Sequence, residues 1–449
     1  MSDVGPDARL RSAVRAGDAE AVRDLLDKGA DPNAVDVNGL PVLCVAVAAY
    51  DERVAEELTV GGADPDRVLP DSTTPLWQAV HGGSPAVFSA VLGPEPRLRL
   101  PEAERERLLT LARCRYETGA AEELRRRTGA SGPAETVRVQ DGAYDWVDQV
   151  SLGGLVMRAG HGAILTSLEW AFRVLTPVDE LIDRAVVQPD EEHADWSAAC
   201  SVLTQRRSFE TWSAVVAHRQ DPDRAHRLFV TGYLRMRGFL DTDPHYEKKE
   251  SELLAAWAAE ETDGEVLAKV LDAYTGRDHP GQEALGLRHA RHPDPRVRRE
   301  VPYALCVDHV PRTPTARAAL LTLMHDPDAE VRLRACTASM RDSDLLPEIT
   351  RALLSLAEAP DAGLRGTAAA ALAGSPDRAP AVADALAALL GDDDQLVRLE
   401  AAHGLALRDD PRTSRAIERV GPLDAGFEHD HRADELWRWR RRNGNSVGG

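Results

Sequence analysis

In the C-terminal third of the chain, an apolar residue followed by arginine recurs shortly after an acidic, proline-rich turn. These pairs lie 33 or 34 residues apart, at Val297-Arg298, Val331-Arg332, Leu364-Arg365 and Val397-Arg398. The stretches between them, such as residues 315–324 and 381–390, carry apolar residues at the i, i+3 and i+4 spacing of a helix. The pattern predicts stacked pairs of helices over about residues 278–422, because a single pair cannot bury its own apolar face.

Each of these units opens with an aspartate three positions before the apolar residue. The aspartates are Asp294, Asp328, Asp361 and Asp394. An aspartate at this position accepts hydrogen bonds from the first turn of a helix and suits its positive end. An alanine-rich run then follows, as at residues 368–371, and small side chains let neighbouring helices approach closely.

The N-terminal part of the chain contains a different repeat, with an offset of 33 residues. The segment GADPNA from Gly29 recurs as GADPDR from Gly62, and Leu43 and Leu76 keep the same offset. The two glycines follow leucine-bearing helices, which they can close at positive φ. In TTPLWQAV, Thr74 is expected to cap a helix that begins at the following proline.

These N-terminal segments resemble ankyrin repeats over about residues 7–93. GDAEAVRDLLDKGADPNAVDVNG from Gly17 resembles a second helix with its hairpin turn, and STTPLWQAVHGG from Ser72 resembles the TPLHxA helix, with Trp77 in place of histidine. Pro41-Val42-Leu43-Cys44 departs from that pattern, which puts the capping of its helix in doubt. The C-terminal segments resemble short HEAT repeats of the bacterial phycocyanobilin-lyase type. That resemblance implies a structural arginine that bonds neighbouring loops across the stack.

The predicted fold is therefore all-α, an alpha solenoid of ankyrin repeats followed by HEAT-like repeats. We divide the chain into ankyrin repeats (1–95), a helical capping or linker region (96–139), an irregular helical region (140–277), HEAT-like repeats (278–422) and a basic tail (423–449). The segment from Val137 to Asp148 is expected to be extended, and HGAILTSLEWAF from His161 resembles a degenerate ankyrin second helix. The sequence does not decide whether the irregular region is HEAT-like or degenerate ankyrin.

Composition narrows the possible functions. A formal charge of −20, from 54 Lys and Arg against 74 Asp and Glu, disfavours a large nucleic-acid surface. Neither a run of about 18 apolar residues nor a signal peptide is present, so no membrane insertion and a cytoplasmic location are expected. The five cysteines are widely spaced without a C-x-x-C pair and are expected to be buried thiols. High Ala, Arg, Asp and Gly usage suggests a bacterial source.

Motifs of catalysis and cofactor binding are missing from the sequence. It contains no dinucleotide-binding glycine motif, P-loop, H-E-x-x-H or G-x-S-x-G. His289 and His292 form an H-x-x-H pair, which a solvated helix end explains better than a metal site. The sequence therefore predicts no enzyme and no catalytic, cofactor-binding or metal-binding residues.

A non-catalytic scaffold or adaptor that binds a partner protein or peptide is the function predicted, with nucleic acid an improbable partner. The alternative is a HEAT-repeat DNA glycosylase for alkylated bases, a function implied by resemblance, for which the candidates are Trp196 or Trp212 with Asp195 or Glu210. A chromophore lyase shares the repeats but has no distinct signal here.

Candidate partner-binding residues lie on the ankyrin hairpins and helices and in the tail. They are Asp36, Asn38, Asp71, Trp77, Trp437, Trp439 and Arg440. The tail places four arginines around two tryptophans, a mixture that can stack on bases, meet an anionic surface or dock in an acidic groove. Its simpler interpretation is a final helix whose basic end suits the helix dipole.

Overall fold

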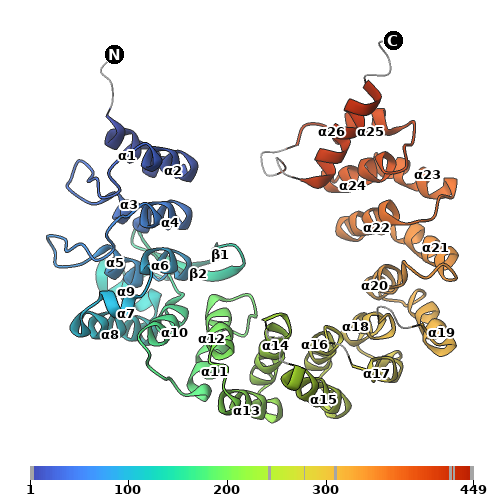
Figure 1. Cartoon of the computed structure of the whole chain (residues 1–449), viewed down its shortest axis with the longest axis horizontal. Coiled ribbons are helices and arrows are strands. Elements are labelled where there is room, and N and C mark those ends of the chain that lie inside the picture. The colour runs from blue at the N-terminus through green and yellow to red at the C-terminus, as the bar shows by residue number, and fades with distance from the viewer. Residues whose placement is uncertain are drawn as a thin grey trace. The chain divides into compact units, whose positions relative to one another are not determined.

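The computed structural model describes residues 5–240, 244–277, 279–307, 311–423, 427 and 430–444. The chain forms two compact units, Met1–Arg237 and Gly238–Gly449. Helices dominate both units, so the predicted all-α solenoid of stacked helix pairs is confirmed (Figure 1). The division into five regions stays a prediction.

Three helix pairs open the N-terminal unit (Figure 1). They are α1 (Pro6–Ala16) with α2 (Ala19–Asp27), α3 (Val42–Ala48) with α4 (Glu52–Val60), and α5 (Pro75–Gly82) with α6 (Pro85–Leu92). The second helix of each pair is capped at equivalent positions, because Asp18, Asp51 and Ser84 accept hydrogen bonds from backbone N–H groups three residues on. The capping hydrogen bonds therefore recur every 33 residues, with the same offset as the repeat in the sequence.

The turns of these repeats agree with the sequence pattern. Gly29 and Gly62 have φ of 88° and 97°, as expected for residues that close a helix. Thr74 Oγ1 accepts from the backbone N–H of Trp77 at 3.0 Å, so the predicted cap of α5 is confirmed. Helix α3 has no side-chain cap at Pro41, which is where the pattern departed from the family.

A fourth pair is split by an insertion. After α7 (Pro96–Arg99), helix α8 (Glu102–Thr118) shares the ankyrin core with α10 (His161–Ala171), through residues that include Leu108 and Ala112 of α8 and Ile164 and Leu168 of α10. Between them lie α9 (Ala120–Thr128) and the strands β1 (Glu135–Asp141), β2 (Asp145–Leu152) and β3 (Leu155–Arg158). The segment from His161 therefore packs as the predicted second helix of an ankyrin-type pair.

The inserted strands form an antiparallel sheet in the order β1-β2-β3, so the expected extended segment is confirmed. Its register pairs Val139 with Val147 and Val150 with Met157. Gly153 and Gly154 both have positive φ and connect β2 to β3 in the two-residue turn that such hairpins favour.

A buried ion pair attaches this sheet to the third ankyrin pair. Asp141 is 2% exposed and accepts hydrogen bonds from Ser84 Oγ at 2.5 Å and from the backbone N–H of Ala86 at 2.8 Å. The guanidinium of Arg158 pairs with the same carboxylate. A buried charge must be paired and hydrogen-bonded, so this network fixes the sheet against the N-terminus of α6.

The N-terminal unit continues through further helices. They are α11 (Val178–Val186), α12 (Ala194–Gln205), α13 (Phe209–Ala217), the short 3-10 helix η1 (His218–Gln220) and α14 (Arg224–Leu240). Val331 in the C-terminal repeats follows the sequence Asp-Pro-Asp by three positions, and His226 follows Asp221-Pro222-Asp223 in the same way.

Among its described residues, the C-terminal unit contains helices and connecting turns but no strand. Its helices are α15 (Pro244–Glu260), α16 (Gly264–Thr275), α17 (Gln282–His289), α18 (Pro295–Leu305), α19 (Pro314–Leu323), α20 (Ala329–Ser339), α21 (Leu346–Leu356), α22 (Ala362–Gly374), α23 (Pro380–Leu389), α24 (Gln395–Ala406), α25 (Thr413–Val420) and α26 (His431–Gly444). One continuous apolar core runs from Val301 in α18 to Trp439 in α26.

The repeated arginines of this unit hold its loops together. Each donates from Nη1 to the carbonyl oxygens five and six residues upstream, as Arg332 does to Pro327 at 3.2 Å and to Asp326 at 2.8 Å. Arg298 also makes two 2.7 Å hydrogen bonds to the carboxylate of Asp326 in the next repeat. Arg365 bonds the carboxylate of Asp392 in the same way. The bonding of neighbouring loops that the resemblance implied is therefore confirmed for Arg298 and Arg365, whereas the bonds of Arg332 lie within its own loop.

Candidate functional site

A cleft of about 660 Å³ lies in the N-terminal unit and includes two of the predicted partner-binding residues. Helices α3 and α5 form one side, with Trp77 and His81 on α5. Helices α8 and α9 supply three arginines, and the β2–β3 hairpin supplies residues 154–157. The cleft thus exists only where the insertion folds back beside the ankyrin helices.

Trp77 provides the aromatic surface of the cleft. Its indole stacks on the imidazole of His81, one helical turn away, with ring centroids 5.0 Å apart and planes 13° from parallel. The Thr74 cap and the proline at the start of α5 set the direction of this helix. Leu155 and Val156 of the hairpin are 36% and 43% exposed and add apolar surface.

His81 lies between two guanidinium groups. Arg115 Nε donates to Nδ1 of the imidazole at 3.1 Å, and Arg127 Nη1 lies 3.1 Å from Nε2. Burial, together with these positive charges, lowers the pKa of His81 to about 4, so the ring is neutral near pH 7. A neutral imidazole can accept at only one nitrogen, so only one of the two arginines can donate to it at a time.

One buried carboxylate anchors this basic group. Glu123 is fully buried and pairs with Arg115 at 3.1 Å and with Arg126 at 2.8 Å. Burial by itself would raise the pKa of Glu123, but the hydrogen bond from Arg126 and the charge of Arg115 lower it overall. Arg127 is exposed and has no carboxylate partner among the residues that the structure describes. This end of the cleft therefore carries positive charge that Glu123 does not neutralise.

The predicted residues of the ankyrin hairpins form hydrogen bonds within their own turns. Asp71 lies at the cleft, where its Oδ1 accepts from the N–H and hydroxyl of Thr73 at 3.0 and 2.7 Å, and these bonds lower its pKa. Asp36 accepts from the N–H groups of Leu40 and Asn38, which likewise lowers its pKa. Asn38 itself is exposed on that hairpin, outside the cleft.

The basic tail forms helix α26, and its two tryptophans face different surroundings. Trp437 is 60% exposed, with the guanidinium of Arg441 5.3 Å from its ring centroid. Trp439 is 8% exposed and belongs to the core of the C-terminal unit. The prediction that Trp439 contacts a partner is therefore wrong. Arg440 is exposed and has no ion-pair partner among the described residues.

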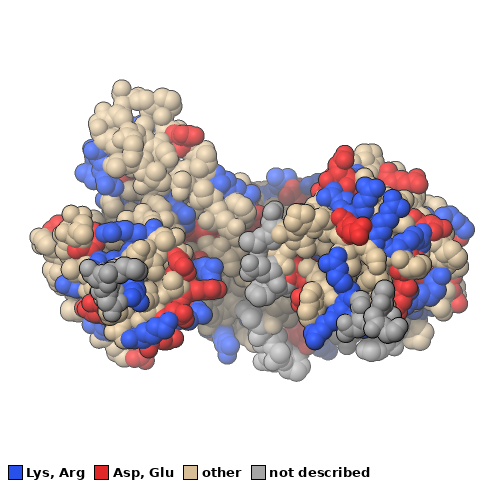
Figure 2. Space-filling model, turned by 90° about the horizontal axis from the view of Figure 1, so that it is seen from above, with Lys and Arg blue, Asp and Glu red and all other residues tan. Residues whose placement is uncertain are grey.

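Charges of both signs are interspersed on the face shown in Figure 2, and basic side chains gather at the right of that view, where the C-terminal helices lie in Figure 1.

The glycosylase alternative required an accessible tryptophan beside a carboxylate. Trp196 and Trp212 are 4% and 9% exposed, and Asp195 accepts a 2.5 Å hydrogen bond from the backbone N–H of Ala163. Asp195 and Trp196 lie on α12 and Trp212 lies on α13, and neither indole offers an open surface for a base.

Sequence reasoning missed the basic side of the cleft. His81, Arg115 and Arg127 are far apart in the sequence and carry no motif. The Gly153-Gly154 turn between Leu152 and Leu155 is a hairpin signal that could have predicted β3, but not its place beside α5. No helix among the described residues is long and apolar enough to cross a membrane.

Comparison with known families confirms both kinds of repeat. Residues 10–37 match the ankyrin repeat, and residues 349–420 match HEAT repeats. The chain therefore combines ankyrin repeats at its N-terminus with HEAT repeats at its C-terminus.

Among curated proteins, the chain is similar to cyclin-dependent kinase 4 inhibitor B of Bos taurus, with 39% identity over 84 residues, 18% of this chain and 63% of that protein. The Rattus norvegicus protein of the same name is 40% identical over 80 residues, 18% of this chain and 61% of that protein. The chain thus spans less than two thirds of these relatives. Among solved structures, YibA of Escherichia coli is matched at 18% identity and a TM-score of 0.42, over 59% of this chain and 93% of that one.

Proposed function

We propose that the protein is a non-catalytic scaffold that binds a partner protein through the cleft between its ankyrin helices and its β2–β3 hairpin. The segment bound is one that carries an anionic side chain next to an apolar one. Ankyrin and HEAT repeats are recognition scaffolds, and the curated relatives are named as inhibitors of a protein kinase, so a protein partner suits both. A bacterial source is the expectation from composition.

The sharing of one neutral imidazole by two arginines is the observation that carries this proposal. When Arg115 donates to His81, the more exposed Arg127 is left with unused donors at the mouth of the cleft. A carboxylate or phosphate of the partner can take those donors in the bidentate geometry that guanidinium groups favour. Glu123 pairs with Arg115 and Arg126 and so holds the basic group in place without neutralising it.

The apolar contact comes from the opposite side of the same cleft. The Trp77 ring and the partly exposed Leu155 and Val156 present aromatic and aliphatic surface beside the arginines. Tryptophan and arginine are enriched among the residues that contribute most to binding at protein interfaces. Such a cleft selects a short segment of a partner more readily than a flat surface does.

Two further surfaces are proposed as secondary contacts. Asn38 and Asp36 lie on the first ankyrin hairpin, and Trp437 and Arg440 lie exposed on α26. The HEAT arginines are excluded as primary contacts, because their guanidinium groups already bond the loops of the C-terminal unit.

The test uses the full-length protein with a photo-crosslinking amino acid in place of Leu155, compared with the same substitution at Tyr144. Tyr144 is 88% exposed in the turn between β1 and β2 and does not line the cleft. The proposal expects one protein to crosslink at position 155 and not at 144, through a segment that contains an acidic or phosphorylated residue. Equal labelling at both positions, or crosslinks to nucleic acid only, would contradict it.

The charge contribution is measured on the partner segment so identified, with Arg127→Ala and with Arg125→Ala as the matched control. Arg125 is exposed on the same helix and pairs with Glu122 outside the cleft. Loss of a charged hydrogen bond of about 1.5 kcal/mol or more predicts at least a roughly tenfold weaker binding for Arg127→Ala. Binding that weakens equally in both variants would show that the cleft arginine is not a specific contact.

A further inference from the structure

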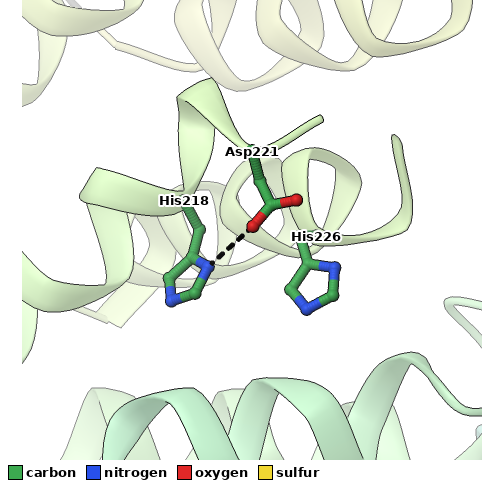
Figure 3. A group of neighbouring side chains, drawn as sticks. All are labelled: His218, Asp221 and His226. Carbon is green, nitrogen blue, oxygen red and sulfur yellow. Dashed lines mark ion pairs between the residues drawn. The ribbon is translucent and has the colours of Figure 1, made fainter. Parts of the chain in front are cut away.

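The turn that joins α13 to α14 holds two histidines and an aspartate in a separate cluster. His218 lies in η1, directly after α13, Asp221 lies in the turn, and His226 lies in the first turn of α14. The structure brings together one ligand atom from each of these three side chains, all within 4.8 Å of one another. Figure 3 shows the two imidazole rings side by side, with the carboxylate of Asp221 reaching between them.

The hydrogen bonding of this turn shows which position His226 occupies. Arg227 Nη1 donates to the carbonyl oxygens of Asp221 at 2.8 Å and of Pro222 at 3.2 Å. Arg332 makes the same two bonds, with the same lengths, to Asp326 and Pro327 of a HEAT repeat. His226 therefore stands at the position that Val331 has in that repeat.

At that position the C-terminal repeats place a buried or half-buried valine or leucine. The His226 side chain is 15% exposed there, and its Nδ1 is buried without a hydrogen-bond partner in the structure. A buried polar atom without a partner costs free energy compared with a valine at the same place. A ligand that uses this nitrogen would remove that cost.

Two carboxylates of α11 orient the imidazoles. Nε2 of His218 lies 3.0 Å from Asp179 Oδ1, and Nε2 of His226 lies 2.9 Å from Asp183 Oδ1. In neutral rings these contacts keep the proton on Nε2 and leave the Nδ1 lone pairs for the cluster, where His218 Nδ1 is 3.5 Å from Asp221 Oδ2. A carboxylate behind each metal-binding histidine is the usual arrangement around a protein metal site.

We propose that His218, Asp221 and His226 bind a divalent transition metal ion, for which Zn²⁺ is the best match. Two imidazole nitrogens and one carboxylate oxygen are ligands that zinc accepts, with a fourth position left to water. Ligand atoms about 2.0–2.1 Å from a tetrahedral zinc lie roughly 3.3–3.5 Å apart. The 3.5 Å contact already has this spacing, and the remaining pairs of ligand atoms, which lie within 4.8 Å of one another, need to move closer by about 1.5 Å at most.

The bound ion would cross-link the two ends of the turn between α13 and α14. Four aspartates lie next to the two rings. Asp179 and Asp221 contact His218, and Asp183 and Asp223 contact His226, with Asp223 Oδ2 3.7 Å from His226 Nδ1. A divalent cation offsets this excess of negative charge more fully than two neutral imidazoles do.

The experiment measures zinc binding to the full-length protein after metal removal with a chelator, by isothermal titration calorimetry at pH 7.5 and by the thermal unfolding temperature with and without zinc. The disrupting variant is His226→Val, which restores the residue type of the HEAT repeats and is expected to fold. His218→Ala is the second variant, and Asp183→Asn removes one orienting carboxylate. His325→Ala is the matched control, because His325 is exposed just before the equivalent turn at Asp326.

The proposal expects one zinc ion per chain and a higher unfolding temperature with zinc in the wild type and in His325→Ala. Both effects should be lost in His226→Val and His218→Ala, and Asp183→Asn should bind zinc about 10–100-fold more weakly. Co²⁺ bound in the same site should give the visible absorption of a tetrahedral complex. A wild type that binds no zinc would overturn the proposal. Equal zinc binding by wild type and His226→Val would place the ion elsewhere, for example at Cys114, which is exposed, so that the sequence prediction of a buried thiol is wrong at this position.

Discussion

Replacing Gly83 with alanine should loosen the junction between β3 and the ankyrin helices. Gly83 ends α5 with φ 80° and ψ 16°, and the equivalent positions one and two repeats earlier are Tyr50 and Gly17, with φ of 55° and 70°. Because Tyr50 adopts this left-handed conformation, positive φ alone does not demand glycine. The special requirement at Gly83 is space, since a Cβ there would lie 1.9 Å from the carbonyl oxygen of Arg158 and 2.5 Å from Cε1 of His161.

The cost follows from these two contributions. Left-handed backbone costs a non-glycine residue about 1–2 kcal/mol. Overpacking in a tight contact typically adds about 1–3 kcal/mol, here because the backbone of Arg158 must move. The junction also loses its crossing hydrogen bond, in which the N–H of Gly160 donates to the Gly83 carbonyl at 2.9 Å. We therefore expect Gly83→Ala to cost about 2–5 kcal/mol of local stability.

Gly129→Ala is the control for this substitution. Gly129 ends α9 with φ 68° and ψ 7°, so its backbone matches that of Gly83, but a Cβ there meets no atom within 4 Å among the described residues. Its expected cost is only the backbone contribution of about 1–2 kcal/mol. The difference between the two variants isolates the contact with Arg158.

Amide hydrogen exchange of residues 155–165 is the assay, because a chain with two compact units need not unfold in a single transition. Gly83→Ala should exchange faster in this segment than the wild type and Gly129→Ala. It should also weaken partner binding, since Leu155 and Val156 of the cleft lie on β3. Equal protection of the segment in both variants would refute the packing argument.

Further predictions concern buried charges. Burial raises the pKa of Asp195 to about 6, so the folded state favours the protonated carboxyl. The free energy of unfolding of the wild type should therefore fall by about 3 kcal/mol as pH rises from about 4 to about 6. Asp195→Asn should gain stability relative to wild type over that range in thermal unfolding, and a stability difference that does not change with pH would refute this prediction. Arg365→Met should cost about 3 kcal/mol of local stability, measured by amide hydrogen exchange of residues 362–374, because the Asp392 carboxylate would lose its ion-pair partner. The cost should shrink in the double variant with Asp392→Asn. Partner binding at the cleft should weaken as salt concentration rises, measured by titration, because the exposed Arg127 is screened; affinity independent of salt would contradict an anionic segment.

Local patterns in the sequence determined the repeats of this protein. The capping aspartates, the glycines at positive φ and the spacing of apolar residues act within one or two helical turns, so Thr74, Asp328 and Gly62 could be assigned from their immediate neighbours. The extended segment near Val137 was visible for the same reason. The repeated arginines bond carbonyl groups five and six residues away, but their bonds to the next repeat, such as that of Arg298 to Asp326, were implied only by the family resemblance.

Only the tertiary structure decided how distant segments meet. The pairing of α8 with α10 across an insertion, the meeting of His81 with Arg115 and Arg127, and the burial of Trp439 depend on contacts between residues tens of positions apart or between separate helices. The sequence showed Asp221-Pro222-Asp223 as a helix start, but the hydrogen bonds of Arg227 were needed to place His226 at a valine position. Local propensity fixes where a helix begins and which face is apolar, whereas the choice of partner depends on the free energy of packing the whole unit, which no short stretch of sequence contains.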